Sequence, residues 1–510
     1  MQMKETEPIL RMEHIVKCYG DLVANNDVSL RLYKGEILAV IGENGAGKTT
    51  LMKVLYGMEQ ASSGSIYLHG KQLNLKSTAH AIANGIGMVQ QHFMLFDPFT
   101  VAENVVYGKE PEKGLYFDLK KANSTVLELS RAYELPLDPQ AKIMGMPVGL
   151  RQRVEIVKVL YQNADIIIFD EPTAVLTPQE VHELLKTMKK LAGTGKSIII
   201  ITHKLNEVME VADRAMVMRA GTMVADVPIK DTSIEELSFM MVGRQLIETD
   251  ILPVEPGEDV LRIEDLVVKG EGAVPSVDRL SMHVRAGEIV GIAGVSGNGQ
   301  SELAKCILGL QKAQSGSVLL KGKAILNRSV REVRESGVSM IPEDRYIWGS
   351  APQATIAETA IMAHYRKPQF SRAGILKITN VLHFAQDIVT RFSVKTDSTR
   401  AKTSSLSGGN AQKLIAAREI LQRTPLLIAC EPTRGVDIGA MEFIHEQLIK
   451  NRSDGAAVLL ISSELSEVIK LSDRIYVMYR GKIHGEFTRG KVKEEELGLL
   501  MARGNQHASE

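Results

Sequence analysis

Short apolar runs alternate along the chain with amphipathic stretches. Three runs in the first half, EILAVIG at 36–42, ADIIIFD at 164–170 and KSIIIIT at 196–202, are apolar on both faces. This pattern is typical of strands buried inside a parallel sheet. The stretch PQEVHELLKTMKKLA at 178–192 has apolar residues at helical spacing and predicts a helix covering such a sheet. The segment 93–147 has weaker strand signals, and we predict a helical insertion there.

The same pattern occurs twice. GEILAVIGENGAGKTTL at 35–51 aligns with GEIVGIAGVSGNGQSEL at 287–303, and IIIFDEPTAVLT at 166–177 aligns with LLIACEPTRGVD at 426–437. Self-similarity of this length predicts two related domains. We place them at 9–245 and 260–505, joined by a linker at 246–259 and followed by a tail at 506–510. Two prolines within DILPVEPGED favour an extended linker.

Composition excludes several classes of protein. The 510 residues carry 61 Lys+Arg and 61 Asp+Glu, so net charge gives no case for nucleic acid as the main partner. Three cysteines without a C-x-x-C motif exclude a disulfide framework and a cysteine zinc site. No apolar run approaches the roughly 20 residues of a membrane span. The N-terminus lacks the apolar region of a secretory signal. We therefore expect a cytosolic chain that does not itself cross a membrane and that can sit on one through a partner.

The segment GENGAGKT at 42–49 fits the phosphate-loop pattern G-x-x-x-x-G-K-[ST]. It follows a predicted buried strand and opens a predicted helix at 49–57. Glycines let successive backbone N–H groups surround phosphate oxygens, and the helix start adds partial positive charge. We expect Lys48 to reach the β- and γ-phosphates and the Thr49 hydroxyl to ligate Mg²⁺. The predicted nucleotide contacts are Gly42, Glu43, Asn44, Gly45, Ala46, Gly47, Lys48, Thr49 and Thr50.

Further chemistry is predicted at the ends of the other buried strands. Asp170 and Glu171 end one strand; Asp170 can hold the metal through water, and Glu171 can orient or activate a water for in-line attack. His203 follows the next strand, where a γ-phosphate sensor is expected.

Two further positions are predicted less directly. Gln91, in GMVQQHF, is the candidate for a second metal and water contact, with Gln90 beside it as the alternative. Tyr19 either stacks on adenine or is an ordinary half-buried tyrosine.

The segment LSGGN at 406–410 precedes the amphipathic stretch AQKLIAAREILQ. Together with the phosphate loop, Gln91, the Asp170–Glu171 pair and His203, it resembles an ATP-binding cassette. The resemblance covers nearly the whole chain, twice. It implies an α/β fold of two tandem P-loop NTPase domains, each a RecA-like core with a helical subdomain, and it implies ATP and Mg²⁺ as cofactors. It also implies that the domains pair head to tail. Ser407, Gly408 and Gly409 then contact the γ-phosphate of an ATP on the first phosphate loop.

Two fused cassettes without a membrane span resemble the ATPase subunit of a bacterial monosaccharide (ribose or galactose) or nucleoside importer. Segments similar to that group are VGLRQRVEI, EPTAVLTPQEV, PEDR and EPTRGVD. GMVQQHFMLFDPFTVAENV at 87–105 is more similar to the nucleoside branch. The resemblance implies integral membrane permease subunits and an extracytoplasmic solute-binding protein as partners. It also implies a peripheral position at the cytoplasmic face of the inner membrane.

The two copies differ where the chemistry is expected. Four residues of the first copy are replaced in the second: Lys48 by Gln300, Gln91 by Glu343, Asp170 by Cys430 and His203 by Ser463. Glu171 alone keeps its identity, as Glu431. The segment MPVGL at 146–150, which would complete the second site, lacks the Ser, one Gly and the Gln of a full LSGGQ motif. Mg²⁺ prefers hard oxygen ligands, so a Cys at this position is a poor substitute. We predict one hydrolytic site and one that binds nucleotide weakly or statically.

Some positions keep two interpretations. Thr177 is better explained as a helix N-cap, whereas Asp437 fits capping and a contact between cassettes equally well. Phe93, Phe96, Phe99, Tyr346 and Trp348 fit either a membrane-subunit interface or core packing.

Two rival functions follow from the same motifs. A soluble tandem-cassette ATPase acting on ribosomes or nucleic acid is disfavoured by the short linker, zero net charge and degraded second site. A non-catalytic nucleotide-sensing scaffold is disfavoured by the intact first site.

Overall fold

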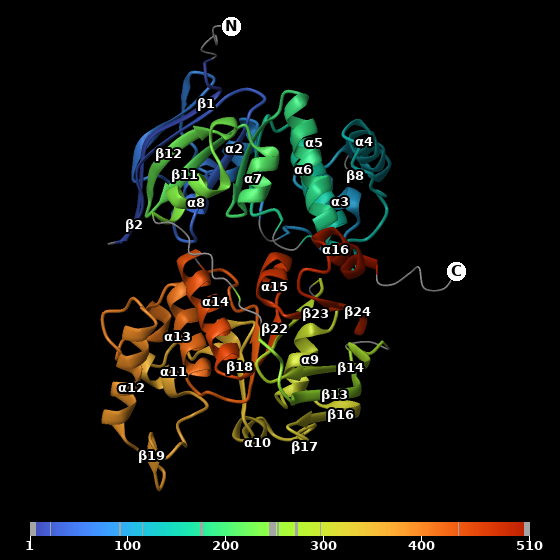
Figure 1. Ribbon diagram of the computed structural model, residues 1–510. Helices are drawn as coiled ribbons and strands as arrows, with labels where there is room; N and C mark the ends of the chain where they lie inside the picture. The colour runs from blue at the N-terminus through green and yellow to red at the C-terminus, as the bar shows by residue number, and fades with distance from the viewer. Residues whose placement is uncertain are drawn as a thin grey trace. The chain divides into compact units, whose positions relative to one another are not determined.

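The computed structural model describes residues 7–20, 22–90, 93–114, 116–173, 176, 178–243, 251, 254–270, 274–295, 297–436 and 438–503. The chain divides into two compact units, Met1–Leu246 and Ile247–Glu510, which are shown in Figure 1. Each is described by itself, as the first unit and the second unit.

A six-stranded sheet forms the centre of the first unit, in the order β12-β11-β3-β10-β9-β6. Its strands are β3 (Ile37–Gly42), β6 (Ile86–Val89), β9 (Ile166–Asp170), β10 (Ser197–Thr202), β11 (Arg214–Arg219) and β12 (Thr222–Pro228). All neighbouring pairs are parallel except the β11–β12 edge. Every residue of β3, β9 and β10 is buried, which confirms the three predicted buried strands.

A second, antiparallel sheet packs on the first and was not predicted. Its order is β2-β1-β4-β5, with β1 (Leu10–Tyr19), β2 (Leu22–Leu32), β4 (Ser63–Leu68) and β5 (Lys71–Leu73). Side chains of β1, the six-stranded sheet and the first helix share one apolar core. The sequence signal was weak because the strands are half exposed and register shifts interrupt the alternation along β1.

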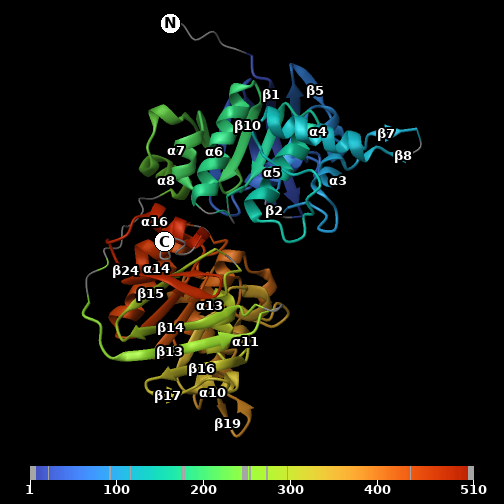
Figure 2. The same ribbon diagram turned by 90° about the vertical axis from the view of Figure 1, so that its right-hand side faces the viewer.

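Eight α-helices are described in the first unit. They are α1 (Lys48–Leu55), α2 (Thr78–Ala83), α3 (Val101–Val106), α4 (Leu119–Ala132), α5 (Val148–Tyr161), α6 (Pro178–Gly193), α7 (Leu205–Val211) and α8 (Ile234–Val242). The predicted insertion at 93–147 contains α3 and α4, which pack with α5. It also contains a hairpin, β7 (Glu112–Lys113) with β8 (Tyr116–Phe117), which projects beyond these helices in Figure 2. Two-residue strands show no periodicity, so the sequence did not predict the hairpin.

The second unit repeats this architecture. Its six-stranded sheet has the order β18-β21-β22-β15-β23-β24 and its antiparallel sheet the order β14-β13-β16-β17. The strands are β13 (Asp259–Val268), β14 (Val277–Arg285), β15 (Ile289–Ala293), β16 (Ala313–Leu320), β17 (Lys323–Ala324), β18 (Val338–Ile341), β21 (Leu426–Cys430), β22 (Ala457–Ile461), β23 (Arg474–Tyr479) and β24 (Lys482–Thr488). The helices are α9 (Gln300–Ile307), α10 (Val330–Glu335), α11 (Ile356–Ile361), α12 (Ile378–Arg391), α13 (Gly408–Ile420), α14 (Ile438–Ser453), α15 (Leu465–Leu471) and α16 (Glu494–Arg503).

Helices α11, α12 and α13 form a helical subdomain with its own apolar core. Within the described residues, no helix of either unit is both long and apolar enough to cross a membrane.

Candidate functional site

The loop between β3 and α1 has two glycines, Gly42 and Gly47, at which a side chain would meet backbone atoms. A Cβ on Gly42 would lie 2.3 Å from the carbonyl oxygen of Met218, and a Cβ on Gly47 would lie 2.3 Å from that of Ala24. Gly47 also has φ of 94°, in the left-handed region. The buried Asn25 amide donates a hydrogen bond to the Gly47 carbonyl at 3.0 Å. The loop is therefore held as a compact turn of backbone N–H groups at a helix start.

Lys48 lies beneath this loop. Its side chain is buried, and its ammonium donates hydrogen bonds to the carbonyl oxygens of Gly42 at 2.7 Å and Glu43 at 2.9 Å. Burial lowers the pKa of Lys48, while the carboxylates of Glu171, Asp170 and Glu43 oppose that shift. The structure thus brings the buried Lys48 ammonium close to the carboxylates of Asp170 and Glu171. A site that binds phosphate together with a metal ion requires such an arrangement, because the cation attracts the phosphate and the carboxylates attract the metal.

Asp170 ends β9 beside the start of α1. The Thr49 hydroxyl donates to Asp170 Oδ1 at 3.4 Å. Burial raises the pKa of Asp170 to about 6, the Glu171 charge adds to this, and the Thr49 hydrogen bond and Lys48 oppose it. A hydroxyl and a carboxylate side by side form the hard-oxygen pair that Mg²⁺ takes as ligands. The donor set therefore fits a magnesium nucleotide.

Glu171 and His203 form the next pair. Glu171 Oε1 lies 3.6 Å from His203 Nδ1, and the Glu171 N–H donates to the carbonyl of Ile201 at 2.9 Å. The pKa of Glu171 is lowered, chiefly by its interaction with His203. Glu171 also has φ of 45°, a sparsely populated conformation that accompanies functional sites. At neutral pH this carboxylate is ionised and able to accept a proton.

The loop after Glu171 is supported by a pair that sequence analysis missed. The Thr173 hydroxyl donates to Glu207 Oε2 at 2.9 Å. In the second unit, the Thr433 hydroxyl donates to Glu467 Oε1 at 2.8 Å. All four side chains are buried. The signal was available, because the EPT segment and a Glu-Val pair, early in α7 and in α15, occur in both copies.

Arg345, in the PEDR segment, makes contacts that the sequence did not predict. Its guanidinium donates to the carbonyl of Arg434 at 3.0 Å, and its Nη2 lies 2.9 Å from the place of a Cβ on Gly408. It therefore connects the PEDR segment, the LSGGN segment and the loop after Glu431 within the second unit.

The remaining predicted residues are placed as follows. Tyr19 ends β1, half exposed, with the Lys17 ammonium 4.8 Å from its ring centroid. Thr50 lies on α1, one position beyond Thr49. Ser407, Gly408 and Gly409 belong to the second unit, where the Ser407 hydroxyl caps α13 by accepting from the Asn410 N–H at 3.4 Å. Gln91, Thr177 and Asp437 lie outside the described residues.

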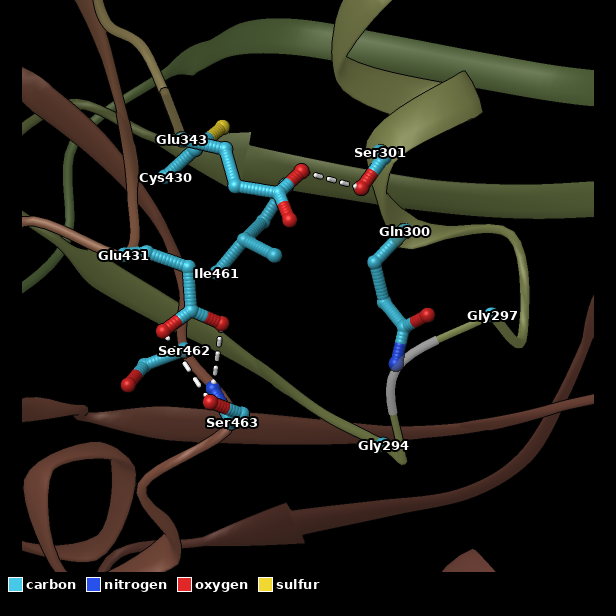
Figure 3. Close-up of a pocket in the computed structure, with 10 residues that line it drawn as sticks. All are labelled: Gly294, Gly297, Gln300, Ser301, Glu343, Cys430, Glu431, Ile461, Ser462 and Ser463. Carbon is cyan, nitrogen blue, oxygen red and sulfur yellow. Dashed lines mark hydrogen bonds between the residues drawn. The ribbon is translucent and has the colours of Figure 1, made fainter. Parts of the chain in front are cut away.

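The corresponding pocket of the second unit, a cavity of about 50 Å³, is shown in Figure 3. It is lined by Gly294, Gly297, Gln300, Ser301, Glu343, Cys430, Glu431, Ile461, Ser462 and Ser463. The residue at the position of Lys48 is the neutral Gln300. Its side-chain amide donates to the carbonyl of Val295 at 3.2 Å. The Ser301 hydroxyl donates to Glu343 Oε2 at 2.5 Å, and Arg434 Nη1 lies 3.5 Å from Glu343 Oε1. The serine at the position of Thr49 thus meets a carboxylate on the opposite side of the pocket.

Glu431 differs from Glu171 in its protonation. It accepts hydrogen bonds from the Ser463 N–H at 2.7 Å and the Ser463 hydroxyl at 3.0 Å. Burial nevertheless raises its pKa to about 7, with Glu467 adding to the shift and Ser463 and Arg434 opposing it. Burial also raises the pKa of the neighbouring Cys430 thiol, and Glu343 and Glu431 act in the same direction. At neutral pH the second pocket therefore has a partly protonated glutamate and a neutral thiol.

This difference predicts opposite effects of pH on stability. Glu431 has an ordinary pKa of 4.5 in the unfolded chain and about 7 in the folded one, so its ionisation costs the folded state nothing below about pH 4.5 and up to about 3 kcal/mol above about pH 7. Glu431→Gln removes the cost. We expect the variant to unfold at a higher temperature than the parent at about pH 8, by about 2–4 °C per kcal/mol, and to match it at about pH 4.5.

The matched control is Glu171→Gln. Because the pKa of Glu171 is lowered in the folded chain, its charge contributes stability above the unfolded pKa, and the amide should not stabilise the chain at about pH 8. Calorimetric melts of both variants test this. A gain for Glu431→Gln that is equal at both pH values would show that the charge is not its cause.

The two helices that carry the LSGGN and MPVGL segments begin differently. α13 begins after Ser407, whose hydroxyl serves as the cap. α5 begins after Pro147, which forms no side-chain cap. The first LSGGQ-like segment is therefore also altered structurally, not only in sequence.

The ABC transporter family matches residues 25–174 and 277–434, and the chain belongs to this family. It carries two copies of the ATP-binding domain, so ATP binding and hydrolysis are the chemistry of its class.

Nearly the full length of the chain is similar to proteins named for import. It is 47% identical to the nucleoside import ATP-binding protein NupA of Lactococcus lactis subsp. cremoris, over 98% of this chain and 99% of the relative. It is 46% identical to the guanosine import ATP-binding protein NupO of Bacillus subtilis, over 98% of both chains. It is 43% identical to the glucose import ATP-binding protein TsgD13 of Haloferax volcanii, over 98% of this chain and 96% of the relative.

Among solved structures, the archaeal ribosome recycling factor aABCE1, in complex with the ribosomal stalk protein aP1, matches with a TM-score of 0.62. The match covers 96% of this chain and 92% of the recycling factor, at 17% identity. At this identity the likeness concerns the fold alone.

Proposed function

We propose that this chain is the ATP-hydrolysing subunit of an importer whose solute is a nucleoside, with a simple sugar as the second candidate. The observation that carries the proposal is the cluster of Lys48, Thr49, Asp170, Glu171 and His203 in the first unit. It occurs in a chain whose relatives, at 47% and 46% identity over nearly full length, are named for nucleoside and guanosine import. These identities exceed the 43% of the glucose import relative and favour the nucleoside.

In the proposed mechanism the first site performs the chemistry. The loop glycines and Lys48 hold the β- and γ-phosphates, and Thr49 and Asp170, together with Gln91, hold Mg²⁺. When bound, Mg²⁺ neutralises charge on the phosphate oxygens. Glu171, which its lowered pKa keeps ionised at neutral pH, orients the attacking water and accepts its proton as the new P–O bond forms. His203 orients Glu171 and senses the γ-phosphate.

The proposal includes head-to-tail pairing of the two units. Ser407, Gly408 and Gly409 then offer the N-terminus of α13 to the γ-phosphate held on the first phosphate loop. Tyr19 is the proposed adenine contact. The second site is proposed to bind nucleotide weakly or statically, because Gln300 is neutral and Ser301 is hydrogen-bonded to Glu343.

ATP hydrolysis by this chain can be coupled to transport of the solute only through partner proteins. We propose integral membrane permease subunits, an extracytoplasmic solute-binding protein, and a peripheral position at the cytoplasmic face of the membrane. The half-exposed Phe96 and Phe99, whose ring centroids lie 5.3 Å apart, and the exposed Trp348 are candidate contacts with the permease.

Co-purification tests this assignment. We expect the native chain, extracted with its membrane in mild detergent, to elute with hydrophobic permease chains and a binding protein that retains a nucleoside. A bound sugar would favour the second candidate. Sedimentation with ribosomes that falls with rising salt, without a permease, would contradict import and favour the ribosome-associated alternative.

A further inference from the structure

A β-hairpin of the second unit extends from the helical subdomain. It consists of β19 (Ser371–Arg372) and β20 (Ile375–Leu376), which pair antiparallel between α11 and α12. Both Figure 1 and Figure 2 show it projecting at one end of the unit, away from the β-sheets.

We call residues 365–378, which include the hairpin, the arm. The charged side chains of the arm are all basic. Residues 359–386 contain no Asp or Glu, and they contain Arg366, Lys367, Arg372 and Lys377, all of them exposed. The acids that flank this stretch are already engaged, since Glu358 caps α11 through Thr355 and Asp387 pairs with Arg391 at 3.0 Å. Within the described residues, neither Arg366 nor Arg372 has a carboxylate partner. The chain as a whole has zero net charge, but this segment is positively charged and is therefore complementary to an anionic surface.

Exposed apolar side chains accompany this charge. Ile375 is 75% exposed, Ile378 58% and Tyr365 51%, and Leu376 is also exposed. Ile375 and Leu376 lie on the hairpin itself and Ile378 begins α12, so apolar surface is exposed to solvent on the hairpin and at its base. Basic residues around an apolar tip are typical of segments that lie in a membrane interface.

The arm is firmly anchored at its base. Phe370 is buried in the subdomain core, with its ring centroid 5.0 Å from that of Phe384. The Lys377 N–H donates to the Phe370 carbonyl at 2.8 Å, and the Asn380 amide donates to the Gln369 carbonyl at 2.9 Å. The base of the hairpin is therefore tied to the subdomain core, which lowers the entropy that docking of the hairpin would cost.

The equivalent hairpin of the first unit has a different charge. Its strands β7 and β8 also project, and Tyr116 is 80% exposed. However, Glu110, Glu112 and Asp118 lie among its lysines. Mixed charge at the same architectural position makes this hairpin an internal comparison.

We propose that the β19–β20 hairpin docks on the anionic phospholipids of the membrane surface. Arg372 of the hairpin and Arg366 before it meet lipid phosphates, and Ile375 of the hairpin and Ile378 at the start of α12 enter the headgroup region. Aliphatic tips favour lipid over nucleic acid, because bases are held by stacking on aromatic rings. The chain then has a membrane contact of its own, which needs neither nucleotide nor a permease and is separate from the proposed function.

Sedimentation of the full-length chain with vesicles tests this contact. We expect binding to vesicles of equal parts phosphatidylcholine and phosphatidylglycerol, and none to phosphatidylcholine alone. Arg366→Ala with Arg372→Ala should weaken binding about 25-fold, since each basic residue near such a surface is worth roughly five-fold. Ile375→Ser with Ile378→Ser should weaken it about ten-fold. The ATPase activity of both variants should equal that of the parent.

The matched control is Lys113→Ala with Tyr116→Ser in the first hairpin, which should bind vesicles as the parent does. Melting curves confirm that each variant is folded. The proposal is overturned if anionic vesicles are not bound, if the control loses as much affinity as the arm variants, or if the isoleucine variant binds unchanged. It is also overturned if single-stranded RNA competes the chain off vesicles through the same arginines.

Discussion

Replacing Glu171 by glutamine is expected to lower the rate of ATP hydrolysis by about 10²–10⁴-fold, the range contributed by a positioned general base. The equivalent change, Glu431→Gln, is expected to leave most of the activity. The two substitutions are chemically identical, and each falls at the end of a buried strand.

The different outcomes follow from the neighbours of each carboxylate. Glu171 lies 3.6 Å from His203 with a lowered pKa, so it is ionised and can accept a proton at neutral pH. Glu431 is held by two hydrogen bonds from Ser463 and has a pKa raised to about 7. Its pocket also has Gln300 and Cys430 in place of a lysine and an aspartate. Glu431 therefore lies beside an incomplete nucleotide site, and the asymmetry rests on the missing lysine and aspartate and not on the basicity of the glutamate.

Steady-state turnover and nucleotide affinity should be measured together. Glu171→Gln should retain ATP binding, because Lys48 and the loop glycines are untouched. Equal losses of turnover in the two variants would refute the asymmetry between the sites. A loss of binding in Glu171→Gln would place its role in nucleotide affinity instead of proton transfer.

Removing the ammonium of Lys48 is expected to have the second large effect. At about 4 Å from a phosphate and an effective dielectric near 20, a lysine charge is worth about 4 kcal/mol before solvent relaxation. Lys48→Met should therefore weaken ATP binding at the first site by up to about 10³-fold and abolish turnover. Gln300→Met removes no charge and should change turnover little.

A fluorescent ATP analogue, titrated into each variant, measures this effect. Because Lys48 also donates to the carbonyls of Gly42 and Glu43, the melting temperature of Lys48→Met should be compared with that of the parent. A folded Lys48→Met variant with unchanged turnover would contradict the proposed site.

The buried strands and the site they carry were the parts most open to prediction. β3, β9 and β10 are apolar on both faces, so their positions follow from composition alone. Because the carboxyl ends of parallel strands meet at one edge, residues that follow them come together there. The sequence analysis assigned Lys48, Thr49 and the Asp170–Glu171 pair to one site from the phosphate-loop pattern and the strand-end carboxylates, and the structure places them near one another. Their roles stay predictions.

Features that depend on contacts distant in sequence could not be predicted. The Thr173–Glu207 hydrogen bond joins residues from separate elements, and the Ser301–Glu343 bond joins a helix start to a strand end. The short hairpins β7–β8 and β19–β20 have no periodicity to detect. The antiparallel sheet was missed because its strands are partly exposed and irregular in register.

The central claim is that one complete pocket in a duplicated chain hydrolyses ATP. The most direct test is a single-turnover experiment on the assembled transporter, in which the assembly is loaded with ATP, started with Mg²⁺ and quenched with acid. We expect a burst of one ADP for each chain, with any second nucleotide recovered as ATP. A burst of two ADP for each chain would contradict it.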